Sequence, residues 1–82
     1  MHTLMIDGSL YSSSEELHMA LKRMLSLPEH YGLNADALND CLSERKDPVH
    51  LWIAAYGSGE VSRSLRTACA VVEDNGGTVK EL

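Results

Sequence analysis

Two aspartates, Asp36 and Asp40, are the clearest candidates for chemistry in this sequence of 82 residues. They are four positions apart, so on a helix their carboxylates lie on one face, about one turn from each other. Like charges at this spacing weaken an isolated helix. The helix dipole can stabilise Asp36 in the first turn, but it does little for Asp40. The pair is therefore either the solvated face of an amphipathic helix or an anionic site for a cationic partner.

Patterns that would indicate a catalytic or metal-binding site are weaker than the pattern of the two aspartates. The four histidines, His2, His18, His30 and His50, lie in different segments and lack ligand spacing such as i and i+4. No serine stands in a nucleophile elbow, and two carboxylates on one exposed helix face are poorly placed to separate their pKa values as an acid and base pair requires. We therefore predict no metal site, no cofactor and no enzymatic activity.

A glycine-containing loop offers a different hypothesis. The run Gly57-Ser58-Gly59 follows an apolar segment and precedes a helical pattern, an arrangement that can hold a phosphate, with Arg63 and Arg66 assisting. The dinucleotide fingerprint requires a third glycine where this chain has Ser62, and a bare G-x-G usually marks a tight turn. A small module that binds a phosphorylated ligand is therefore the least favoured alternative.

The aspartate pair needs a helix to position it, and the local signals for that helix are clear. Pro28 and Gly32 interrupt the preceding helical pattern, and Asn34 is a good N-cap residue. Apolar residues then repeat at helical spacing on the face opposite the aspartates. This pattern predicts a helix over residues 35–43, from Ala35 to Ser43.

The remaining segments predict the elements around that helix. Residues 3–6 (TLMI) and 49–55 (VHLWIAA) read as buried strands, with Trp52 in the core and His50 partly buried and neutral. Ser13 and Glu16 form the S-x-x-E capping box of a first helix, and a last helix follows the glycine loop. Residues 78–82 (TVKEL) read as an edge strand. The order strand, helix, helix, strand, helix, strand predicts an α/β fold, with a small three-stranded parallel sheet packed with helices and residues 49–55 as its central strand.

The size and charge of the chain limit its function further. Its length, with 44% hydrophobic residues, suits a single domain over residues 1–82. Twelve acidic and seven basic side chains give a net charge of -5, which disfavours nucleic acid and favours basic protein partners. No secretion signal or membrane span is recognisable, so we expect a cytoplasmic monomer. Cys41 and Cys69 fall on helix faces and are expected to be free, buried thiols.

The segment around the aspartates resembles the barstar family, intracellular inhibitors of the secreted ribonuclease barnase. The resemblance lies in Leu27-Pro28-Glu29, Tyr31-Gly32, Asn34, Asp36-Ala37-Leu38 and Asp40-Cys41-Leu42. It extends weakly to the whole chain and implies the same β-α-α-β-α-β fold. It also implies an inhibitor that plugs the active site of a basic, barnase-like ribonuclease, with Asp40 as central anchor in the phosphate site and Asp36 beside it. The implied partner-binding residues are His30, Asn34, Ala35, Asp36, Asn39, Asp40, Ser43 and Glu44.

Several positions depart from the family pattern. His30 replaces a tyrosine, Asn39 replaces a tryptophan, and Glu44-Arg45 replaces a glycine and a tryptophan. The family's acidic residue on the last helix aligns near Val71, with Glu73 close by. These differences suggest a different cognate nuclease or weaker binding to the familiar one. An immunity or regulatory protein that uses the same acidic helix against a toxin or partner other than a ribonuclease remains an alternative.

Overall fold

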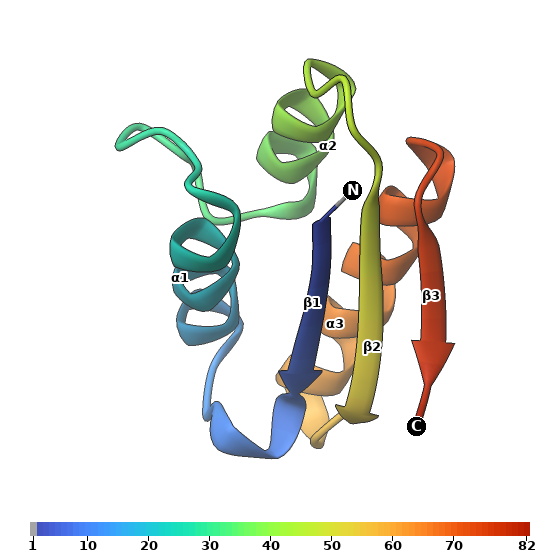
Figure 1. Ribbon diagram of the computed structural model, residues 1–82. Helices are drawn as coiled ribbons and strands as arrows, with labels where there is room; N and C mark the ends of the chain where they lie inside the picture. Colours follow the sequence, from blue (N-terminus) through green and yellow to red (C-terminus); the bar gives the residue numbers. More distant parts are fainter. Residues whose placement is uncertain (1) are drawn as a thin grey trace.

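A computed structural model describes residues 2–82 and contains three strands, three α-helices and one short 3-10 helix (Figure 1). In chain order these are β1 (His2–Asp7), the 3-10 helix η1 (Gly8–Leu10), α1 (Ser14–Leu25), α2 (Ala35–Ser43), β2 (Val49–Ala55), α3 (Gly59–Asp74) and β3 (Thr78–Glu81). This order confirms the predicted α/β fold. The η1 turn was not predicted from the sequence.

The three strands form a parallel sheet in the order β1-β2-β3. In the register of the sheet, Leu4 pairs with Leu51 and Leu51 with Val79, while Met5 pairs with Trp52 and Trp52 with Lys80. Strand β2 is therefore central and β3 lies at an edge, as predicted. Figure 1 shows α3 behind the sheet, α1 beside β1 and α2 at the end where β1 and β2 begin.

One face of the sheet packs against the helices and the other is open. Leu4, Ile6, Leu51 and Ile53 are at most 6% exposed on the packed face. The core also contains helical residues, among them Leu17, Leu21, Leu38, Leu42, Leu65, Ala68 and Val72. The prediction that Trp52 lies in the core is wrong, because this side chain points to the open face and is 43% exposed. Apolar residues on both faces of β2 conceal the alternation that distinguishes a half-buried strand from a fully buried one.

The helix boundaries follow from local capping. The hydroxyl of Ser13 accepts a hydrogen bond from the backbone N–H of Glu16 (3.1 Å), as the capping box predicts. The Glu16 carboxylate, however, accepts from the backbone N–H of Ser12 (2.6 Å), one residue before the N-cap. At the other end of α1, the guanidinium of Arg45 donates to the Leu25 carbonyl (3.2 Å), which ties the segment after α2 to this helix.

The described residues include no helix that is long and apolar enough to cross a membrane. Cys41 and Cys69 are free thiols, as predicted. Cys69 is buried, but Cys41 is only partly buried, because it lines the surface pocket described below.

Candidate protein-binding site

Helix α2 starts at a well-formed cap, as predicted from Asn34. The Asn34 side-chain oxygen accepts from the backbone N–H of Ala37 (2.8 Å), and its amide donates to the carbonyl of Gly32 (3.1 Å). Leu33, just before the cap, has a left-handed backbone conformation with φ of 55°. Asn34 therefore satisfies one of the free N–H groups of α2 and also fixes the loop that leads into it.

The outward face of α2 carries carboxylates in successive turns. Asp36, Asp40 and Glu44 are all exposed, whereas Leu38 and Leu42 on the opposite face are 1% and 5% exposed. Among residues 2–82, no hydrogen bond or ion pair engages any of these three carboxylates. Each can accept several hydrogen bonds, so α2 presents a row of acceptor oxygens to a partner that brings its own donors.

The loop before α2 is anchored by a buried hydrogen bond that the sequence did not indicate. The hydroxyl of Tyr31 lies 2.7 Å from Nδ1 of His18, and these residues are 6% and 3% exposed. Burial lowers the pKa of His18, and burial together with nearby Cys41 raises the pKa of Tyr31. Both groups are therefore neutral near pH 7, and their bond holds the loop against α1. A turn in which the N–H of Tyr31 donates to the Pro28 carbonyl (2.9 Å) shapes the loop itself.

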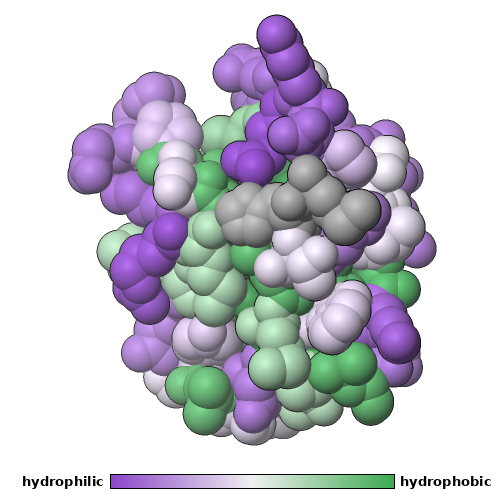
Figure 2. Space-filling view, viewed as in Figure 1, coloured by the Kyte–Doolittle hydropathy of each residue, from purple (hydrophilic) through white to green (hydrophobic). Residues whose placement is uncertain are grey.

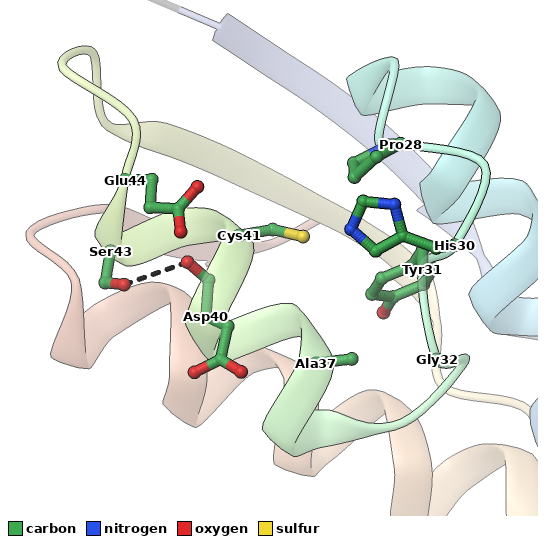
Figure 3. Close-up of a pocket in the computed structure, with 9 residues that line it drawn as sticks. All are labelled: Pro28, His30, Tyr31, Gly32, Ala37, Asp40, Cys41, Ser43 and Glu44. Atoms are coloured by element: carbon green, nitrogen blue, oxygen red, sulfur yellow. Dashed lines mark hydrogen bonds between the residues drawn. The ribbon is translucent and has the colours of Figure 1, made fainter.

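This loop and α2 enclose a pocket of about 420 Å³ (Figure 3). Its lining residues are Pro28, His30, Tyr31 and Gly32 from the loop and Ala37, Asp40, Cys41, Ser43 and Glu44 from α2 and its C-cap. In Figure 3 the His30 ring faces the Cys41 sulfur across the opening, and the Ser43 hydroxyl donates to the Asp40 carbonyl (2.9 Å). The wall formed by α2 is therefore acidic.

The Cys41 thiol lies in the pocket close to two of its carboxylates. Its pKa is raised, first by burial and then by the carboxylates of Glu44 and Asp40. The two carboxylates thus act on the interior of the pocket as well as on its rim. A cationic or hydrogen-bond-donating side chain from a partner would be favoured there.

The structure brings together only part of the predicted residue set. His30, Asp40, Ser43 and Glu44 line the pocket, and exposed Asp36 lies on the same helix. Asn34 and Ala35 instead border a smaller hollow of about 250 Å³ near the start of α2. The Asn39 side chain is directed toward α3, where its oxygen accepts from the amide of Asn75 (2.9 Å).

The partner-binding residues predicted from the sequence did not include Pro28, Cys41 or Asn75. A pocket wall depends on how the loop lies against the helix, which no spacing along the chain reports. The link between Asn75 and Asn39 similarly joins residues 36 positions apart. It connects the end of α3 to α2 near the position where the resemblance suggested Glu73, which is exposed.

The glycine loop has a structural explanation. Gly57 has φ of 75°, and a Cβ placed on it would lie 2.6 Å from the carbonyl oxygen of Gly8. Its lack of a side chain therefore lets two loops approach closely. The guanidinium of Arg66 lies over the Tyr56 ring, 4.1 Å from its centroid.

Among residues 2–82, no group of three or more His, Cys, Asp or Glu side chains is arranged to hold a metal ion.

Two comparisons with known proteins give matches to this chain. The family model described as Barstar (barnase inhibitor) matches residues 1–77. The chain is also similar to the Bacillus subtilis (strain 168) protein named "Putative ribonuclease inhibitor YrdF", with 46% identity over 43 residues. That alignment covers 52% of this chain and 47% of the relative, so it spans about half the length of each protein.

Proposed function

The chain belongs to the barstar family, and from this premise we propose that it binds a basic microbial ribonuclease in the cytoplasm and blocks its active site through helix α2. A ribonuclease gathers lysine, arginine and histidine around the scissile phosphate. A helix with exposed carboxylates can present oxygens to those donors in place of the phosphate. Asp40 is the anchor in this proposal, and Asp36 and Glu44 are its charged neighbours.

The observation that carries the proposal is the exposure of the Asp36, Asp40 and Glu44 carboxylates, together with their lack of bonding partners within the described part of the chain. They are exposed on one helix and have no partner among residues 2–82, although isolated like charges at this spacing cost helix stability. Asp40 and Glu44 also border the pocket, which can receive a side chain of the partner. Protein donors supplied by a ribonuclease would both neutralise the charges and fill the pocket.

The composition of the site favours binding through charge. The family's aromatic residues are replaced by Asn39 and by Glu44-Arg45, and the Arg45 guanidinium is engaged with the Leu25 carbonyl. The net charge of -5 adds long-range attraction to a basic enzyme, which speeds association and weakens as salt screens it. We therefore expect inhibition that depends strongly on salt, against a cognate enzyme whose surface is not complementary to aromatic residues.

The proposal is tested by adding the protein to a panel of purified basic microbial ribonucleases and following RNA cleavage at low and moderate salt. At least one enzyme should be inhibited stoichiometrically by the wild type and not by Asp40→Ala. Glu60→Ala is the control, because Glu60 is an exposed acid in the first turn of α3, away from α2, and its removal changes the net charge equally. Inhibition that is equal in both variants would contradict the role of α2. Binding to a basic toxin that is not a ribonuclease, without inhibition of any enzyme in the panel, would favour the immunity alternative.

A further inference from the structure

The pocket between the loop and α2 has a histidine on one wall and carboxylates on the other. His30 comes from the loop, and Asp40 and Glu44 come from α2 and its C-cap. In Figure 2 the loop and the end of α2 stand out as two hydrophilic projections at the upper margin of the molecule, with a hollow between them. In Figure 3 one nitrogen of the His30 ring is directed toward the opening, with Cys41 on the opposite side. The imidazole is therefore placed where it acts on a group that enters the pocket.

The His30 ring is not held by a structural contact. It is exposed, and among residues 2–82 it has no hydrogen bond or ion pair. His18, in contrast, is buried with its Nδ1 2.7 Å from the hydroxyl of Tyr31. The Nδ1 of His50 lies 2.6 Å from the hydroxyl of Thr78. Of these three histidines, only His30 can gain or lose a proton without disturbing a hydrogen bond within the fold.

The charged groups that face His30 near neutral pH are the two carboxylates across the pocket. The Cys41 thiol and the Tyr31 hydroxyl also line the pocket, but burial raises the pKa of each, so both are neutral. On the side of α1, the ammonium of Lys22 lies 3.5 Å from the carboxylate of Glu29, so these opposite charges pair with each other. After α2, the guanidinium of Arg45 donates to a backbone carbonyl of α1. The electrostatic potential in the pocket is therefore set mainly by its own two carboxylates.

We propose that His30 makes binding of the partner depend on pH, with tight binding when its imidazole is neutral and weaker binding when it is protonated. This inference rests on the proposed function, which brings a lysine or arginine of the partner to Asp40. Two carboxylates and a neutral imidazole accommodate such a cation. A protonated imidazole on the opposite wall repels it, and because the contact excludes water, this repulsion is screened less than on an open surface. Protonation also cancels part of the negative charge that attracts the partner.

The direction and size of the effect follow from proton linkage. A cation held across from His30 disfavours the protonated ring, so the complex binds this proton less readily than the free inhibitor does. Histidine side chains ordinarily change their charge between about pH 5 and pH 8, with half of them protonated at about pH 6.5. The affinity is thus fully present above this range and decreases as the pH falls through it. For a ring that is protonated only in the free inhibitor, a drop from about pH 7.5 to about pH 5.5 weakens binding about tenfold.

The test measures the dissociation constant for a ribonuclease that the wild type inhibits, from about pH 5.5 to about pH 7.5 at constant ionic strength. His30→Gln keeps a hydrogen-bonding side chain that cannot be protonated in this range. Between these two pH values the dissociation constant of the wild type should rise about tenfold more than that of His30→Gln. The histidines of the enzyme titrate equally with both inhibitors, so the difference belongs to His30. His50→Gln is the matched control, because it removes an imidazole that does not line the pocket and should retain the wild-type pH dependence.

Parallel pH profiles for the wild type and His30→Gln, with inhibition intact, would overturn this inference and leave the proposed function standing. The same holds if the wild type binds more tightly than His30→Gln at low pH, because the partner would then present an acceptor to the protonated ring. Equal loss of the pH dependence in His50→Gln would also overturn it; circular dichroism at both pH values establishes that the variants are folded. Absence of inhibition by the wild type at any pH, or inhibition that Asp40→Ala does not affect, would remove the premise and so overturn both proposals.

Discussion

The buried pair of His18 and Tyr31 gives the most specific prediction about the stability of the site. Tyr31→Phe removes the hydroxyl that lies 2.7 Å from Nδ1 of His18 while leaving the ring in place. The change costs the net value of this hydrogen bond, about 0.5–1.5 kcal/mol, and also removes a longer one that the hydroxyl donates to the Asn34 carbonyl (3.5 Å). It leaves a buried imidazole nitrogen without its partner. Because His18 is only 3% exposed, water cannot readily replace the hydroxyl, so we expect a total loss of about 1–3 kcal/mol.

Urea unfolding of the wild type and Tyr31→Phe at pH 7.5 measures this loss. For a domain of this size each kcal/mol also lowers the melting temperature by about 4–8 °C. A double-mutant cycle that combines Tyr31→Phe with His18→Leu tests the same hydrogen bond more strictly. The double variant should recover part of the loss, because replacing both partners of a buried hydrogen bond with apolar groups leaves no unsatisfied nitrogen.

Two results would refute this reasoning. A free energy of unfolding for Tyr31→Phe within about 0.3 kcal/mol of the wild type would mean that the hydroxyl contributes nothing net. If the double variant loses the sum of the free energies of unfolding that the two single variants lose, the two side chains do not interact. Either result would remove the anchor that we assign to the loop before α2.

Three further predictions concern stability. Burial lowers the pKa of His18 below its ordinary value of 6.5, so as the pH falls the unfolded chain binds this proton before the folded chain does. The contribution of neutral His18 to the free energy of unfolding should therefore be fully present above about pH 6.5 and decrease as the pH drops toward the lowered pKa. Urea unfolding at a series of pH values should show that the free energy of unfolding depends less steeply on pH in His18→Gln than in the wild type. Gly57→Ala should lower the melting temperature more than Gly59→Ala. Both glycines have positive φ, but only at Gly57 would a Cβ lie against a backbone oxygen, that of Gly8. Equal decreases in melting temperature would contradict this reasoning. Asn34→Ala should lower the free energy of unfolding in urea by about 0.5–2 kcal/mol, and Asn34→Asp should lower it much less, because aspartate can still cap α2. Equal decreases in the two variants would exclude capping as the cause.

The sequence predicted α2 correctly because the signals for this helix are local. Asn34 caps it, and Leu38 and Leu42 mark its buried face within nine residues. The order of the strands also followed from short apolar segments and the rules for parallel connections. These features depend on neighbouring residues, so they can be read without knowing the tertiary structure.

The features that the sequence did not predict depend on distant contacts. Trp52 was assigned to the core because apolar residues fill both faces of β2, and only the absence of a second helical layer exposes it. The bond between His18 and Tyr31 joins residues thirteen positions apart, and the one between Asn39 and Asn75 joins residues still further apart. Asn39 was selected as a partner-binding residue by resemblance alone, and its contact with α3 depends on how the two helices pack.

The central claim is that the carboxylate of Asp40 binds the cationic site of a ribonuclease. The most direct measurement is the dissociation constant of Asp40→Asn for the enzyme that the wild type inhibits, with Glu60→Gln as a control that changes the net charge equally. Removing one member of a buried charge pair costs about 3–5 kcal/mol, so Asp40→Asn should bind at least about 100-fold more weakly, while Glu60→Gln changes affinity little. Equal affinities of the two variants would contradict the claim.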